Sequence, residues 1–218
     1  MRFRKVKKAV AEMEEYKGDM YLKEYMNLKG NWNSIFENKN PIKLEIGMGR
    51  GKFLIGMAEE NENINYLGMD KLGTLLLKPL KRIEDKKMNN IRIFGGNAIE
   101  LEDIFEENEL DELFLNFSDP WPKDRHFKRR LTYKGFLQKY ARVLKSGGRI
   151  NFKTDNDALF DFSMEEIREV NAKIIDLTYN LHEEKDEKIF TTEYEDKFKA
   201  QGIKIKRVIF ELNKNICE

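Results

Sequence analysis

The sequence predicts an α/β fold in which a doubly wound, mostly parallel sheet follows a basic N-terminal arm. From residue 41 onward, short apolar segments typical of buried strands alternate with longer segments of helical periodicity. Several apolar segments end in glycines or in an acid or amide, as strands do at the ligand-binding edge of an open sheet. The chain is therefore divided into an N-terminal basic extension, residues 1–40, and one domain, residues 41–218.

Apolar segments and helical spacing define the individual elements in order. The expected strands cover residues 43–46, 64–69, 91–94, 113–117, 149–153, 173–177 and 205–212. The expected helices cover residues 9–16, 53–58, 72–86, 133–144 and 158–170. Pro79 is a candidate kink within its helix, and Ser146-Gly147-Gly148 is expected to end the helix over 133–144.

Composition excludes several classes of protein. The chain has 218 residues, is 40% hydrophobic, and contains no apolar run of about 18 residues that would span a membrane. No apolar segment of the secretory type follows the basic N-terminus. A lone cysteine, Cys217, precludes an internal disulfide, and no Cys/His cluster predicts a metal site. We expect a cytoplasmic protein that acts away from membranes.

The near-neutral net charge of +1 conceals an uneven charge distribution. Residues 1–8 and 123–130 are strongly basic, whereas acids concentrate in residues 100–112. Two local basic clusters favour a local anionic partner, such as a nucleic acid, over a generally basic surface. The alternative is that these runs are simply solvated.

A glycine-rich loop follows the first strand of the domain, in the pattern Glu45-x-Gly47-x-Gly49-x-Gly51. Glycines let the backbone turn tightly and approach a ligand closely. The spacing differs from the Gly-x-Gly-x-x-Gly that places a pyrophosphate on a helix N-terminus, and the acid Glu45 favours a cation over a phosphate. S-adenosyl-L-methionine, with an amino-acid end and a sulfonium cation, meets both conditions. A plain strand–helix turn is the alternative.

Polar residues also follow the second and third strands. Asp70 lies about 20 residues beyond the glycine loop, where an acid typically binds ribose hydroxyls. Its alternative role is to cap the helix that follows. Asn97 is placed to contact the adenine edge, or else to stabilise its own loop.

The fourth strand runs into the loop Asn116-Phe117-Ser118-Asp119-Pro120-Trp121-Pro122-Lys123, which two prolines stiffen. We expect Asp119 to face the transferred group and Trp121 to offer a flat surface to a base, unless this loop is a structural turn with Trp121 in the core. The basic segment that follows suits RNA, because cations bind phosphates and aromatic rings stack on unpaired bases.

Four motifs carry a resemblance to a known family. They are Gly30-x-Trp32, the extended segment Asp119-Pro120-Trp121-Pro122-Lys123-x-Arg125-His126-x-Lys128-Arg129-Arg130-Leu131, Phe152-Lys153-Thr154-Asp155-Asn156, and Thr192-Glu193-Tyr194-Glu195. They resemble, in collinear order, the signature of bacterial-type tRNA (guanine-N7)-methyltransferases. The resemblance implies a Rossmann-like methyltransferase sheet and methyl transfer from S-adenosyl-L-methionine to N7 of a tRNA guanine in the variable loop.

The resemblance also implies roles for individual residues. The cofactor-binding positions are Glu45, Gly47, Gly49, Gly51, Asp70, Asn97 and Asp119, and Asp119 is also the proposed catalytic residue. The substrate-binding positions are Lys123, Asp155, Thr192, Glu193, Tyr194 and Glu195. The RNA-contacting positions are Arg125, His126, Phe127, Lys128, Arg129 and Arg130. Two positions depart from the pattern, since Asp70 stands where Glu is common and Asn97 where Asp is common. Both keep an acceptor oxygen, so the departures bear on cofactor affinity and contact geometry.

Elementary chemistry agrees with this function. Guanine N7 has an in-plane lone pair and no proton to lose, so methyl transfer requires positioning rather than a general base. Two alternatives stay open: a methyltransferase acting on another RNA or a protein, and a non-catalytic RNA-binding protein of the same fold. Both a monomer and a homodimer are compatible with the sequence.

Overall fold

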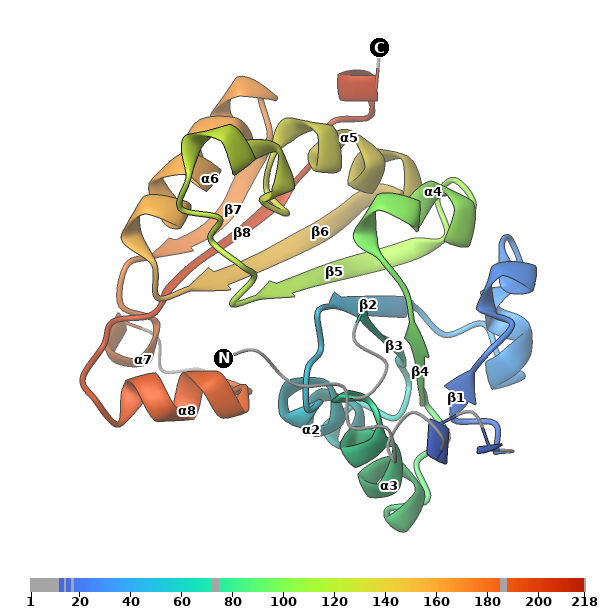
Figure 1. Ribbon diagram of the computed structural model, residues 1–218. Coiled ribbons are helices and arrows are strands. Elements are labelled where there is room, and N and C mark those ends of the chain that lie inside the picture. Colours follow the sequence, from blue (N-terminus) through green and yellow to red (C-terminus); the bar gives the residue numbers. More distant parts are fainter. Residues whose placement is uncertain (1–11, 14, 17, 72–74, 185–187, 218) are drawn as a thin grey trace.

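The computed structural model describes residues 12, 13, 15, 16, 18–71, 75–184 and 188–217. Within them, eight strands form one sheet in the order β1-β4-β3-β2-β5-β6-β8-β7 (Figure 1). The strands are β1 (Tyr21–Leu22), β2 (Ile42–Ile46), β3 (Asn65–Asp70), β4 (Ile91–Gly95), β5 (Leu110–Asn116), β6 (Leu144–Thr154), β7 (Lys173–Thr178) and β8 (Lys206–Glu211). Neighbouring strands from β1 to β6 are parallel, and only β8 runs antiparallel to its neighbours. The predicted α/β fold is confirmed.

Helices cover both faces of the sheet. They are α2 (Lys52–Glu60), α3 (Leu77–Asp85), α4 (Leu101–Ile104), α5 (Lys134–Val143), α6 (Asp157–Glu169), α7 (Leu181–Glu184) and α8 (Glu193–Lys199). In Figure 1, α2 and α3 lie below the sheet, and α4, α5 and α6 lie above it. Strand β5 shows why two cores form: Leu113 and Leu115 join the core under α4 to α6, whereas Phe114 between them joins the core with α2. No helix of the described residues is long and apolar enough to cross a bilayer.

The helix predicted over 133–144 ends for a different reason from the one expected. It stops at Val143, and Leu144 is already extended and begins β6. The expected stop at Ser146-Gly147-Gly148 is therefore wrong, because this tripeptide lies within β6. There Gly147 has a φ of 75°, and the register between β5 and β6 shifts between Leu110 and Glu112. Gly147 permits this irregularity in β6, because residues with an L side chain rarely adopt such a positive φ.

The helix predicted over 72–86 is shorter than expected. Its α-helical part is Leu77–Asp85, and residues 72–74 lie outside the described part of the chain. Pro79 falls in the first turn, where a missing backbone N–H costs no intrahelical hydrogen bond. Pro79 therefore need not kink the helix. Of the helix expected over 9–16, residues 9–11 and 14 lie outside the described residues, and residues 12, 13 and 15 are helical.

Residues 21–36 contribute to the sheet and to the core. Tyr21 and Leu22 pair with β4 as the edge strand β1. The Trp32 side chain is fully buried, and its Nε1 donates to the Ile104 carbonyl oxygen at 3.0 Å. Its ring centroid lies 4.9 Å from that of Phe105, a residue far along the sequence. This part of the N-terminal extension thus packs against the domain, and the boundary at residue 40 stays a prediction.

We predict that Trp32→Ala lowers the free energy of unfolding by about 3–5 kcal/mol, because it removes a buried ring and leaves a cavity in the core. Urea denaturation followed by circular dichroism measures the effect. The exposed Met26, in the same N-terminal region, provides the control Met26→Ala, which should change stability little. Equal, small effects for both variants would contradict this account of the core.

Candidate active site

Parallel pairing brings the ends of β2, β3, β4, β5 and β6 to one edge of the sheet. The loops that the sequence singles out all begin there. Two hydrogen bonds join the first two loops directly: Gly47 N donates to the Met69 carbonyl oxygen at 2.7 Å, and Gly49 N donates to Asp70 Oδ2 at 3.1 Å. The glycine loop and Asp70 are thus parts of one site.

Gly47 and Gly49 border open space. Their φ values of 81° and 55° lie in the left-handed region, and a Cβ built on either would meet no other atom within 4 Å. Gly51 serves a different purpose, because a Cβ there would come within 2.8 Å of Met48 and 2.9 Å of Pro79. The first two glycines therefore leave room for a ligand to approach the backbone, and the third permits close packing of α2 and α3.

Glu45 lies inside the sheet, at 1% exposure. Asn116 Nδ2 donates to its Oε1 at 2.8 Å, while its Oε2 is buried without a hydrogen-bond partner among the described residues. Burial raises the pKa of Glu45 to about 8, against the opposing effects of the Asn116 hydrogen bond and the Lys153 charge. A buried carboxyl group with an oxygen that lacks a hydrogen-bond partner among the described residues suits a cationic ligand.

Asp70 and Asn97 make different local contacts. Asp70 is the last residue of β3 and is mostly buried. Leu76 is the N-cap of α3, and residues 72–74 lie outside the described residues, so the capping role considered for Asp70 stays a prediction. Asn97 is exposed, and its Oδ1 accepts from Ile99 N at 3.2 Å as the cap of a 3₁₀ turn. That bond is the loop-stabilising use of an asparagine, and contact of Asn97 with an adenine stays a prediction.

The loop after β5 holds Asp119 out to solvent. Phe117 and Trp121, on either side of Asp119, have φ values of 53° and 43°, a conformation that is costly for large side chains. The Asp119 side chain is 72% exposed, and Lys71 Nζ lies 3.9 Å from its Oδ2. Trp121 is only partly buried and belongs to neither core cluster. Its ring instead faces the His126 ring at 5.7 Å and the Arg129 guanidinium at 4.9 Å.

The basic segment forms a 3₁₀ helix, Asp124–Arg129, whose residues fall into two groups. Arg125, Lys128 and Arg129 are exposed, as suits phosphate contacts. Arg130, by contrast, donates from Nε to the Pro120 carbonyl oxygen at 3.1 Å and from Nη2 to that of Trp121 at 3.2 Å. The Arg130 guanidinium also lies 4.4 Å from the Phe162 ring. Arg130 therefore holds the Asp119 loop in shape, a structural role that its sequence pattern did not indicate.

Phe127 and Lys123 complete the segment. The Phe127 ring meets that of Tyr133 edge-on at 5.3 Å and is 37% exposed. Lys123 is exposed at the start of the 3₁₀ helix. These positions are accessible to a large ligand, and their contacts with substrate stay predictions.

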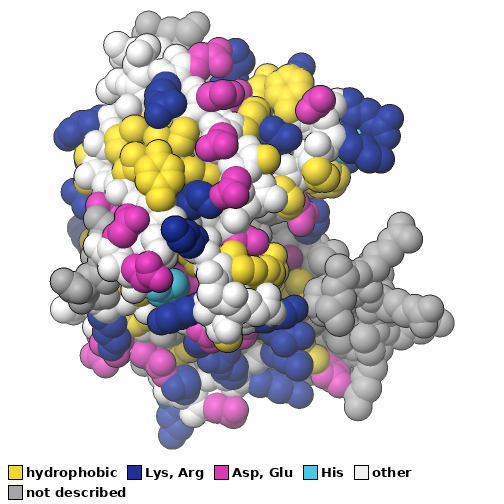
Figure 2. All heavy atoms as spheres, turned by 90° about the vertical axis from the view of Figure 1, so that its left-hand side faces the viewer, with side chains coloured by type: hydrophobic (Ala, Val, Ile, Leu, Met, Phe, Trp, Pro, Cys, Tyr) yellow, Lys and Arg dark blue, Asp and Glu magenta, His cyan; other side chains and the backbone are white. Residues whose placement is uncertain are grey.

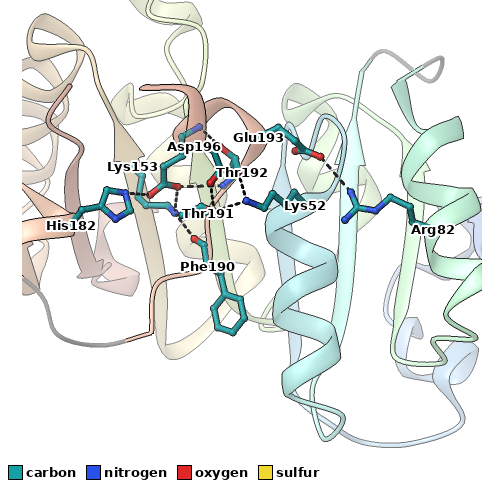
Figure 3. Close-up of polar contacts among 10 residues, drawn as sticks. Lys52, Arg82, Lys153, His182, Phe190, Thr191, Thr192, Glu193 and Asp196 are labelled. Atoms are coloured by element: carbon teal, nitrogen blue, oxygen red, sulfur yellow. Dashed lines mark hydrogen bonds and ion pairs between the residues drawn. The ribbon is translucent and has the colours of Figure 1, made fainter. Parts of the chain in front are cut away.

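The motif Thr192–Glu195 lies at the start of α8, and it too contains both buried structural residues and an exposed one (Figure 3). Thr192 is the N-cap, and its Oγ1 accepts from Glu195 N at 2.9 Å. The Glu195 side chain is fully buried, with Oε2 2.8 Å from Lys153 Nζ and Oε1 2.9 Å from His182 Nε2. This buried position differs from the substrate contact that the resemblance implies for Glu195. Tyr194 is 47% exposed, and its ring lies 5.2 Å from that of Phe117.

Asp155 lies close to this motif. It follows β6 and precedes Asn156, the N-cap of α6. Burial raises the pKa of Tyr194, and the negative charge of Asp155 adds to that rise. Asp155 and Tyr194, far apart in sequence, are thus electrostatic neighbours at the same edge of the sheet.

Sequence reasoning missed the residues that hold this motif in place. Lys52 on α2 donates to Thr191 Oγ1 at 2.9 Å and also pairs with Asp196, and Arg82 on α3 lies 3.4 Å from Glu193 (Figure 3). Lys153 is the most informative of them, because a lysine in an apolar strand is a signal for a buried partner. No local pattern identifies Glu195 as that partner.

A doubly wound sheet with this glycine loop defines the Rossmann-like methyltransferase class, and solved structures agree. An antibiotic-related methyltransferase matches with a TM-score of 0.62 and 18% identity over 90% of this chain and 97% of its own. The 16S rRNA methyltransferase KamB matches with a TM-score of 0.62 and 13% identity over 84% of this chain and 93% of its own. At such identities the likeness concerns the fold alone.

Sequence comparisons reach further. The family model described as "Putative methyltransferase" matches residues 39–208. The tRNA (guanine-N(7)-)-methyltransferase of Alkaliphilus oremlandii is 44% identical over 96% of this chain and 98% of its own length. That of Bacillus subtilis is 41% identical over 88% of this chain and 91% of its own length. The chain belongs to the tRNA (guanine-N(7)-)-methyltransferase family.

We predict that Glu45→Gln removes a pH dependence from the stability of the free protein. The pKa of Glu45 is about 8 when folded, against 4.5 for the ordinary group, so its contribution to the free energy of unfolding is complete below pH 4.5 and is lost as pH rises through about 8. The variant should therefore gain stability relative to wild type between these pH values. Urea denaturation at both ends of the range measures it.

The matched control is Glu165→Gln on the exposed surface of α6. Its stability relative to wild type should not follow this pH course. A constant difference between Glu45→Gln and wild type across the range would contradict the buried, proton-retaining state of Glu45.

Proposed function

We propose that this chain transfers a methyl group from S-adenosyl-L-methionine to N7 of a guanine in tRNA, in the cytoplasm, with a guanosine of the variable loop as the target. The observation that carries the proposal is that Asp119 is exposed, lies 3.9 Å from Lys71, which directly follows β3, and precedes the exposed cations of the 3₁₀ helix. Relatives with this activity in their names, 40–44% identical over most of the chain, support it.

The residues at the edge fit S-adenosyl-L-methionine. The unpartnered Glu45 Oε2 suits a cationic ligand, and the space beside Gly47 and Gly49 admits it close to the backbone. Asp70 would accept hydrogen bonds from ribose hydroxyls, and Asn97 would contact the adenine edge. When bound, the cofactor supplies an electrophilic methyl carbon on a sulfonium.

Asp119 is the residue placed to work on the guanine. N7 carries a lone pair and no proton, so no residue has to act as a general base. The Asp119 carboxylate would accept hydrogen bonds from guanine N1–H and the exocyclic amine, which orients the base for in-line attack. The same carboxylate would stabilise the positive charge that develops on the ring. The nearby Trp121 ring offers a surface for an unstacked base.

The 3₁₀ helix supplies the contact to the tRNA backbone. Arg125 and Lys128 are exposed on it and suit phosphates. Arg129 lies over the Trp121 ring, so it would join phosphate binding to the placement of that ring. Arg130 is engaged with the loop and is assigned no phosphate.

We predict that Asp119→Ala lowers the single-turnover rate of methyl transfer to tRNA by roughly 100-fold, because the variant can neither orient the guanine nor stabilise its charge. Asp119→Asn should be only partly active, since its amide donor faces the donors on guanine. Rates are measured with saturating cofactor, folding is checked by circular dichroism, and nucleoside digestion identifies 7-methylguanosine.

Asp103→Ala, an exposed acid on α4, is the matched control and should transfer at the wild-type rate. Parallel incubations with ribosomal RNA and with protein test the substrate. A folded Asp119→Ala enzyme with near wild-type rates would refute the role of Asp119, and wild-type transfer only to ribosomal RNA or protein would refute the proposed function.

We predict that the double variant Arg125→Ala/Lys128→Ala binds tRNA more weakly and with a shallower dependence on salt. Removing one phosphate-binding cation reduces the slope of log K against log[salt] by about one, because fewer counterions are released on binding. Filter binding at several salt concentrations measures the slope, and calorimetry should give unchanged cofactor affinity. Arg149→Ala/Lys173→Ala is the control, because these two exposed cations flank Glu211 of β8 and lie outside the 3₁₀ helix; it should leave the slope unchanged.

A further inference from the structure

The segment Phe190–Asp196, named here the strap, crosses the carboxyl edge of the sheet and is anchored by cations from three other elements. Figure 3 shows Lys52 of α2, Arg82 of α3 and Lys153 of β6 all pointing toward it. Lys52 and Arg82 form partly exposed contacts with Thr191, Asp196 and Glu193. Lys153 differs from both because its side chain is buried.

The Lys153 ammonium holds the strap at two points. Its Nζ donates to the Phe190 carbonyl oxygen at 3.1 Å and to Glu195 Oε2 at 2.8 Å. The exposed fractions of the two side chains are 4% for Lys153 and zero for Glu195. The Phe53 ring, 4.8 Å from Nζ, covers the ammonium further. One cation therefore fixes both the start of the strap and the first turn of α8.

The backbone of Lys153 holds the neighbouring loop. Its carbonyl oxygen accepts from Phe117 N at 2.9 Å, at the residue where the loop that carries Asp119 leaves β5 with a φ of 53°. The Phe117 ring lies 5.2 Å from the Tyr194 ring of the strap. The Phe117–Tyr194 contact thus joins two segments that Lys153 also holds. Its backbone binds the Asp119 loop, and its side chain binds the strap.

The burial of the Lys153–Glu195 ion pair indicates its role in the fold. Burial lowers the pKa of Lys153, and Glu195 and, more weakly, Glu45 counteract that effect. A buried ion pair contributes little net stability compared with apolar side chains of similar size, but it is demanding in geometry. The Lys153–Glu195 pair is therefore better suited to fixing the place of α8 than to stabilising the fold.

We propose that Lys153 is a positioning residue for methyl transfer, which holds the strap so that Tyr194 stays against Phe117 beside the Asp119 loop. The inference rests on the proposed function. Lys153 is buried beneath the strap and acts through Tyr194, which presents a half-exposed ring at the edge where the guanine would lie. Small displacements of such a surface slow a reaction that depends on alignment.

A double-mutant cycle on the single-turnover rate tests this coupling. Lys153→Met and Tyr194→Ala should each slow transfer to tRNA by roughly 10- to 100-fold at saturating cofactor. If Lys153 acts through Tyr194, the double variant should be no slower than the slower single variant. Calorimetric titration with S-adenosylhomocysteine counts the folded sites, so that a loss of folded protein is not scored as a slow rate. Lys153→Arg, which keeps the charge, should restore part of the rate.

Lys145→Met is the matched control, because Lys145 is on the same strand and pairs with Asp111 at 2.8 Å, but at the other end of β6 and exposed. It should leave the rate unchanged. If Lys153→Met fails to fold, Glu195→Gln replaces it in the cycle, since it weakens the pair and keeps the capping acceptor. Here too the effect should vanish in the Tyr194→Ala background.

Additive effects in a cycle whose single variants are both slow and folded would overturn the inference, because Lys153 would then act independently of Tyr194. A wild-type rate for folded Lys153→Met would overturn it as well. Both results leave the wild-type formation of 7-methylguanosine intact. Failure of the proposed function is distinct, since the wild-type enzyme would then form none in the same assay.

Discussion

Parallel pairing around the central strand β2 is the constraint on which the rest of this structure depends. β2 pairs with β3 on one side and with β5 on the other, both in parallel, so three loops leave the sheet at the same edge. The helices that return the chain to the opposite edge must cover the faces, as Figure 1 shows. The glycine loop, Asp70 and the Asp119 loop meet because of this topology, although the first and the last lie far apart in the sequence.

Glu45 and Asp119 are both acids in motifs that the sequence singles out, but they differ in burial. Glu45 is inside the sheet at 1% exposure, whereas the Asp119 side chain is 72% exposed. Burial raises the pKa of Glu45 to about 8, whereas Asp119 faces solvent. Under the proposed function, a carboxylate near a cationic cofactor and a carboxylate near a polar base edge would need these different environments.

Charged side chains of both signs are mixed on the surface. In Figure 2, basic side chains are spread over the face that it presents and lie beside acidic ones, in keeping with a net charge of +1. Local structure rather than total charge therefore decides where an anion binds. In the basic 3₁₀ helix, Arg125 and Lys128 are exposed to solvent. Arg130, directly after this helix, instead donates hydrogen bonds to backbone carbonyls of the Asp119 loop. One basic run thus contains both solvent-exposed cations, which are proposed to contact the substrate, and an arginine that holds the loop in shape.

The sequence by itself determined the layered α/β fold, most strand positions, the glycine loop and the family, because these depend on local periodicity and on contiguous motifs. Strand 43–46 and helix 158–170 were predicted to within a residue, since apolar spacing reports directly which face is buried. Only the tertiary structure decided that Ser146-Gly147-Gly148 lies within a strand, that Arg130 supports a loop, and that Glu195 pairs with Lys153. Each of these depends on partners distant in the chain, and a sequence motif records a residue's identity without recording its burial or its partner.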